Sequence, residues 1–127
     1  MHDSLHITNK TKSTLHRVPF LAIKNAVMGK EYELSLVFVG TRRSRKLNNS
    51  YRQKDKPTNI LSFILDTESG EIFITPKVAE KEAKKFDRSY TNFIAFLFIH
   101  GLFHLKGLDH GTIMETAEEK IRKQFGI

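Results

Sequence analysis

Cysteine is absent from the 127-residue sequence. Its absence excludes a disulfide scaffold, a thiolate nucleophile, an iron–sulfur cluster and a cysteine-ligated zinc finger. A transition metal, if one is bound, must therefore be held by histidine and carboxylate side chains. Long hydrophobic runs are absent too: the longest apolar stretch, residues 93–99, is too short to cross a bilayer, and no secretory signal is visible. We expect a cytoplasmic protein with no membrane partner.

Acidic residues are fewer than basic residues. The sequence has 21 Lys and Arg residues against 14 Asp and Glu residues, for a net charge of +7. Residues 42–56 carry almost all of this excess, and a concentrated positive patch attracts polyanions such as RNA. A solvated basic helix without a partner is the alternative interpretation. The basic residues of this window are Arg42, Arg43, Arg45, Lys46, Arg52, Lys54 and Lys56.

The hydrophobic pattern predicts one domain spanning residues 1–127. Strands are expected at residues 5–8, 33–39, 60–65 and 71–75. Helices are expected from Ser13 or Thr14 to Met28 (with an apolar stripe that starts at Leu15), over residues 42–51, after Pro76, from Ser89 or Thr91 to His104, and from Thr112 onward. This order predicts an α+β fold in which a small mixed sheet packs against several helices. Residues 93–99 are apolar on every side, so their helix should be buried centrally.

Three histidines follow one another closely at the end of that central helix. His100 and His104 are four residues apart, which places both imidazoles on one helix face. Gly107 can adopt positive φ, end the helix and let the chain double back, so that His110 swings toward the first pair. Three imidazoles and an open position are the arrangement of a catalytic zinc site. Asp109 or a backbone carbonyl could accept a hydrogen bond from an imidazole behind the metal.

Other interpretations of these histidines stay open. They could be unrelated, or they could form a structural zinc site with Asp109 as the fourth ligand. The spacing also equals that of the long zinc-protease motif, but Gly101 stands where those enzymes carry the glutamate that acts as general base. A metallopeptidase would need a substitute carboxylate, such as Glu71 or Asp109.

A zinc site beside a basic surface suits a phosphodiester substrate better than a peptide. Arginine can bind two phosphate oxygens at once and stabilise the charge that develops at phosphorus. Arg52 lies where the basic segment leads into a predicted strand. The alternative role for Arg52 is an ion pair with a local acid such as Asp55.

Two long motifs resemble the bacterial YbeY family. The first is LNNSYRQKDKPTNILSF at residues 47–63, followed by GEI at residues 70–72, and the second is HGLFHLKGLDH at residues 100–110. The family pattern H-G-x-L-H-L-x-G-Y-D-H is matched at seven positions of the second motif. The departures are Phe103 in place of leucine, Leu108 in place of tyrosine, and Glu71 in place of the aspartate of G-D-I.

The resemblance implies a zinc-dependent, single-strand-specific endoribonuclease, a hydrolase of phosphodiester bonds that acts in small-subunit rRNA maturation and ribosome quality control. It implies one zinc ion per chain on His100, His104 and His110, with Arg52 as the active-site arginine. Single-stranded ribosomal RNA would be the partner, with ribosomal proteins or ribosome-associated GTPases as further partners. The other basic residues of the window, 42–56, would guide the RNA backbone. A non-catalytic ribosome assembly factor with a zinc-stabilised fold is the main alternative.

Overall fold

The computed structural model describes residues 4–14 and 17–127, and the bounds below refer to these ranges. The strands are β1 (Leu5–Asn9), β2 (Glu33–Phe38), β3 (Ile60–Asp66) and β4 (Ser69–Ile74). The helices are α1 (Phe20–Met28), α2 (Thr41–Arg52), α3 (Pro76–Lys85), α4 (Tyr90–Leu105) and α5 (Thr112–Phe125). The order of elements is the predicted one.

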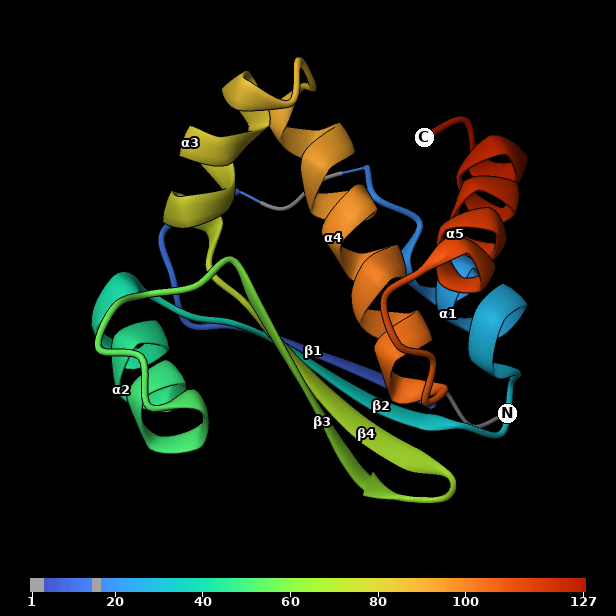
Figure 1. The fold of residues 1–127 in the computed structure, drawn as a ribbon, viewed down its shortest axis with the longest axis horizontal. Coiled ribbons are helices and arrows are strands. Elements are labelled where there is room, and N and C mark those ends of the chain that lie inside the picture. Colours follow the sequence, from blue (N-terminus) through green and yellow to red (C-terminus); the bar gives the residue numbers. More distant parts are fainter. Residues whose placement is uncertain (1–3, 15–16) are drawn as a thin grey trace.

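The strands form one mixed sheet in the order β1-β2-β4-β3. β1 pairs with β2 and β2 pairs with β4 in parallel, whereas β3 and β4 form an antiparallel hairpin. Figure 1 shows α1, α3, α4 and α5 gathered over one face of this sheet, with α2 apart from them. The predicted α+β fold with a small mixed sheet is confirmed.

The two faces of the sheet bury separate hydrophobic clusters because side chains alternate along each strand. Leu34, Leu36 and Ile72 are fully buried in the larger cluster, beneath the group of helices that includes α4. Val37 and Phe73 point the other way, into a small cluster that Leu47 of α2 covers. The basic helix α2 therefore lies on the opposite face of the sheet from α4.

Helix α4 is the central element of the larger cluster, as its uniform apolar sequence predicts. The Ser89 side chain caps its first turn by accepting a hydrogen bond from the Asn92 backbone N–H at 3.1 Å. Ten of its sixteen residues are buried. In the described ranges, no helix combines the length and apolar character that a membrane span requires.

Helix α1 begins later than the sequence suggested. The predicted start at Ser13 or Thr14 is wrong, because the first helical residue is Phe20. Pro19 disfavours helical geometry at Val18, and its own carbonyl accepts the first backbone hydrogen bond, from Ile23 at 3.0 Å. The part of the predicted apolar stripe at Leu15 lies outside the described residues.

Gly101 lets α4 approach the sheet closely. A Cβ atom at this position would lie 2.7 Å from Ile60 Cδ1, 3.0 Å from Ser62 Oγ and 3.2 Å from Ile72 Cδ1. The Ser62 hydroxyl donates to the Gly101 carbonyl at 3.4 Å. The absence of a side chain at residue 101 thus sets the distance between α4 and strands β3 and β4.

We expect Gly101→Ala to lower the free energy of unfolding by about 1–2 kcal/mol. Overpacking a tight contact costs about 1–3 kcal/mol, and the better helix propensity of alanine, at most about 1 kcal/mol, recovers only part of it. Denaturant unfolding of Gly101→Ala and of the wild-type protein provides the measurement, and wild-type stability in the variant would contradict the close approach.

Candidate metal centre

Three imidazoles converge at the C-terminal end of α4. The candidate ligand atoms of His100, His104 and His110 all lie within 4.8 Å of one another. The Nε2 atoms of His100 and His104 are 3.1 Å apart, as the four-residue spacing on one helix face predicts. The His110 ring centroid lies 5.1 Å from that of His100 and 4.8 Å from that of His104. The structure therefore brings together all three predicted metal ligands.

Two glycines make the chain reverse between α4 and α5. Gly107 has φ of 86°, the left-handed conformation that the sequence predicts, and its N–H bonds to the His104 carbonyl at 2.9 Å. Gly111 has φ of 151° and accepts the first hydrogen bond of α5 from Glu115 N–H at 3.0 Å. This second glycine, directly after His110, was not anticipated. Together they direct His110 back toward α4.

Glu118 of α5 provides the carboxylate behind the histidines. Its Oε1 lies 2.7 Å from His100 Nδ1, and only 8% of its side chain is exposed. A carboxylate at this position accepts a hydrogen bond from a protonated Nδ1. The lone pair of His100 is then left on Nε2, which faces His104. Sequence reasoning missed Glu118, because nothing local links it to a residue eighteen positions earlier on another helix.

The arrangement fits a tetrahedral divalent ion. Two imidazole nitrogens at about 2.0–2.1 Å from a zinc ion lie roughly 3.3 Å apart, close to the 3.1 Å between Nε2 of His100 and Nε2 of His104. The Glu118 hydrogen bond fixes the ring orientation of His100, as carboxylates commonly do behind metal ligands. His100, His104 and His110 could therefore hold a metal ion.

The carboxylates suggested from the sequence lie elsewhere. Asp109 is exposed and, among the described residues, bonds to none of the three imidazoles; Glu118 occupies the acceptor position instead. Glu71 accepts a hydrogen bond from Ser35 Oγ at 3.1 Å and alternates along β4 with Ile72, so it points to the sheet face opposite α4. Neither one takes the place of a peptidase glutamate, and Gly101 itself faces the sheet, where a side chain has no room.

The histidines open into a cleft of about 760 Å³ that also contains Arg52. The cleft runs between α4, β3 and α5, with His100, His104, His110, Glu118 and Arg122 among its lining residues. Among the described residues, no ion pair joins Arg52 to Asp55, the alternative that the sequence left open. Asp55 accepts two hydrogen bonds from Arg45 instead, at 2.7 and 2.9 Å.

Local hydrogen bonds hold the Arg52 segment in place. Arg52 is the last residue of α2, and Gln53 ends the helix in the left-handed conformation with φ of 56°. The buried Ser44 side chain exchanges hydrogen bonds with Thr58, and Asn48 Nδ2 donates to the Lys56 carbonyl at 2.8 Å. These contacts fasten the following loop to α2, so the start of β3 and Arg52 stay close together.

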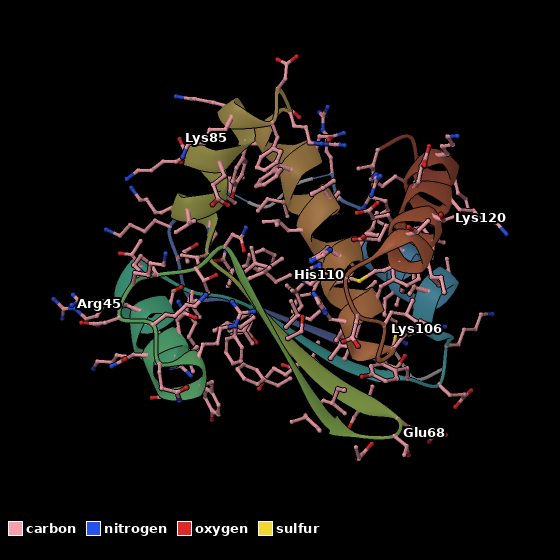
Figure 2. All side chains as sticks on the ribbon, in the orientation of Figure 1. Arg45, Glu68, Lys85, Lys106, His110 and Lys120 are labelled. Carbon is pink, nitrogen blue, oxygen red and sulfur yellow. The ribbon has the colours of Figure 1, made fainter. Side chains whose placement is uncertain are left out.

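The remaining basic residues of the 42–56 window lie outside this cleft. Figure 2 shows Arg45 projecting outward from α2, far from His110, which lies beside α4. The described residues that line the cleft include Arg52 but none of the other six basic residues predicted to bind RNA: Arg42, Arg43, Arg45, Lys46, Lys54 and Lys56. All six are exposed, and α2, which carries four of them, packs on the other face of the sheet.

The environment of His104 disfavours its charged form. Burial is the main factor that lowers the pKa of the His104 imidazole, and the neighbouring His100 and His110 lower it further. Glu118 raises the same pKa, and the positive charge of Arg52 lowers it slightly. His104 is therefore neutral at pH 7, the form that binds metal.

Comparison with known proteins reveals one consistent family. A family model described as endoribonuclease YbeY matches residues 2–126. A protein named endoribonuclease YbeY from the Aster yellows witches'-broom phytoplasma is 36% identical over 138 residues, covering 97% of this chain and 94% of that protein. One of the same name from Finegoldia magna is 33% identical, covering 98% and 90%. A solution structure from Thermotoga maritima has the same fold, with a TM-score of 0.66 at 24% identity over 96% of this chain and 89% of that one.

In the metal-free protein, we expect His104 to titrate below the ordinary imidazole pKa of about 6.5. Glu118→Gln should lower the midpoint further, because it removes the negative charge that favours imidazolium. The folded protein binds this proton less tightly than the unfolded chain, so His104 should make the free energy of unfolding fall as pH drops through about 6.5. NMR titration of the imidazole C–H signals measures the midpoint.

Glu119→Gln is the control for this titration. It makes the same charge change one residue later on α5, where Glu119 pairs with Lys123 at 3.3 Å. A His104 midpoint at or above 6.5, or equal shifts in the two variants, would contradict the placement of Glu118.

Proposed function

The chain belongs to the endoribonuclease YbeY family, and on this premise we propose that it is a zinc-dependent endoribonuclease that cleaves single-stranded RNA. One observation carries the proposal: the nitrogens of His100, His104 and His110 converge within 4.8 Å in a cleft that also contains Arg52. The family names support nuclease chemistry, and the three histidines support a metal. We propose zinc because three imidazole ligands with an open position are typical of catalytic zinc sites.

Different residues of the cleft would bind the ion and the substrate. His100, His104 and His110 would bind one zinc ion per chain, which when bound supplies a Lewis acid for the scissile phosphate. Arg52 would bind the phosphate oxygens and stabilise the charge that builds up on them. Glu118 would keep the His100 lone pair on Nε2, the atom that would bind the ion. In the described ranges, the structure shows no bond between Asp109 and an imidazole, so a place for Asp109 behind the metal is only a prediction.

The basic residues outside the cleft would act on the RNA at longer range. The α2 residues Arg42, Arg43, Arg45 and Lys46, with Lys54 and Lys56 of the adjoining loop, form an exposed positive surface. Such a surface contributes salt-sensitive, sequence-independent affinity for the backbone. We propose that it steers RNA toward the cleft, whereas Arg52 contacts the reacting phosphate.

The cellular role follows from the family resemblance. We propose that residues 1–127 form one domain that acts on small-subunit ribosomal RNA, in its maturation and in ribosome quality control, with ribosomal proteins or ribosome-associated GTPases as partners. Two hydrophobic clusters packed on opposite faces of one sheet support the single domain.

We expect His104→Ala to lower zinc affinity by more than about 100-fold, since loss of a ligand should exceed the 10- to 100-fold effect of residues behind the ligands. Cleavage of single-stranded RNA should fall with it, and chelation of the native protein should have the same effect. Metal analysis and gel-based cleavage assays provide the measurements. His6→Ala is the control, because His6 is an exposed histidine on β1. Cleavage that survives chelation in protein freed of contaminating ribonuclease would contradict the proposal.

Arg52→Ala should retain stoichiometric zinc while kcat falls about 100- to 1000-fold, the usual effect of removing a donor that stabilises transition-state charge. Arg52→Lys should recover only part of this loss, because lysine keeps the charge but lacks the two-pronged geometry. Steady-state kinetics and metal content are measured on the same preparations. Loss of zinc in Arg52→Ala would show that Arg52 supports the metal site instead.

A further inference from the structure

Three phenylalanines form a stack at the end of the cleft away from the histidines. The rings of Phe86 and Phe93 are 5.3 Å apart and nearly parallel, and those of Phe93 and Phe96 are 5.6 Å apart and nearly parallel. All three line the same cleft as His100. Phe93 is buried, but Phe86 is 57% exposed. More than half of the Phe86 side chain is therefore open to solvent at this end of the cleft.

Two guanidinium groups lie over the Phe96 ring of this stack. The Arg88 guanidinium carbon is 4.4 Å from the ring centroid, and that of Arg122 is 5.2 Å from it. Arg88 donates to the Asn92 side chain and, at 3.2 Å, to the main-chain oxygen of Ile127. Among the described residues, no Asp or Glu side chain forms an ion pair with either arginine. Glu82, which lines the cleft, accepts a hydrogen bond from the Asn59 side chain at 2.8 Å.

The convergence of these two cations favours an anionic ligand. Burial lowers the pKa of Arg88, and the positive charge of Arg122 lowers it further, as expected for like charges brought together. A phosphate group placed beside them would relieve this repulsion and could accept hydrogen bonds from Arg122. Aromatic faces next to arginines are the usual means of binding single-stranded nucleic acid, since every base has a flat face.

Helix α4 connects this end of the cleft to the metal centre. Phe96 and His100 are four residues apart on one helix face, an axial separation of about 6 Å. At about 3.4 Å per stacked nucleotide, that separation corresponds to roughly two nucleotides. Figure 1 shows the C-terminal parts of α3 and α5 on either side of the first half of α4.

We propose that Phe86, Phe96, Arg88 and Arg122 form a nucleotide-binding subsite that holds the RNA strand next to its scissile phosphate. The exposed face of Phe86 stacks on a base, and Arg122 contacts the adjoining phosphate. The subsite deepens the proposed ribonuclease function and rests on it, because it supplies the single-strand preference: a base must be unpaired to stack on Phe86.

The test measures binding of a fluorescein-labelled 2′-O-methyl oligouridylate by fluorescence anisotropy at several salt concentrations, with gels to show that the probe stays intact. Phe86→Leu keeps an apolar side chain but removes the flat face, and it should weaken binding at least about fivefold. Ile7→Ala is the control: this side chain, 47% exposed, lies on β1 at the opposite edge of the sheet and should leave affinity unchanged.

Arg122→Gln tests the phosphate contact. It should weaken binding and reduce the slope of log K against log salt by about 0.7, the value for one phosphate contact on a single strand. Lys120→Gln removes the same charge from α5, and Figure 2 shows Lys120 pointing outward, away from α4. That control should leave the slope unchanged.

Two outcomes would overturn the subsite: wild-type affinity in Phe86→Leu, or equal slope changes in Arg122→Gln and Lys120→Gln. Cleavage of unmodified RNA by the wild-type protein is assayed in parallel and tests the ribonuclease function separately. If the wild-type protein cleaves RNA but the variants bind the probe with unaltered affinity, the subsite alone would be overturned. Phe86-dependent binding without cleavage would support the subsite and overturn the ribonuclease activity.

Discussion

The position of α4 on the sheet determines where the rest of the site can lie. The helix buries most of its surface, so its place is fixed by the core and not by the histidines. Gly101 permits the close approach, with Ile60 and Ile72 directly beneath it. His100 and His104 occupy the narrow stripe of the helix that remains open to the cleft. Side chains carried on such a packed element hold a defined geometry without a ligand to organise them.

A second helix completes the site from the other side. The reversal at Gly107 and Gly111 returns the chain toward α4, which delivers His110 and starts α5. Nearly two turns into α5, Glu118 reaches His100. A carboxylate this deeply buried is costly without a partner, so its hydrogen bond to the imidazole stabilises the docking of α5 as well as the ring orientation. The packing of the two helices and the geometry of the candidate metal ligands therefore depend on the same contact.

The sequence predicted what depends on local pattern. The order of elements, the buried helix and the convergence of three histidines follow from periodicity, from a four-residue spacing and from one glycine. What it could not predict depends on distant contacts. Glu118 meets His100 only after two helices pack, and the alternation of β4 sends Glu71 to the wrong face for any role at the histidines. The start of α1 was placed too early because an apolar stripe outweighed the restriction that Pro19 imposes.

Two groups of positive side chains bear on the proposed activity at different ranges. Apart from Arg52 at its end, the cations of α2 are exposed and lie on the sheet face opposite the histidines. Salt screens charges beyond about 8–10 Å, so in the proposed activity these cations would affect encounter with an anionic strand more than the chemistry. Arg52 and Arg122 line the cleft itself, together with the three histidines. The concentration of positive charge in the sequence indicates the first group. In the proposed activity, the second group fixes the RNA strand relative to the metal. The positions of these arginines within the cleft, and not the number of positive charges, decide which phosphate reaches the three imidazoles.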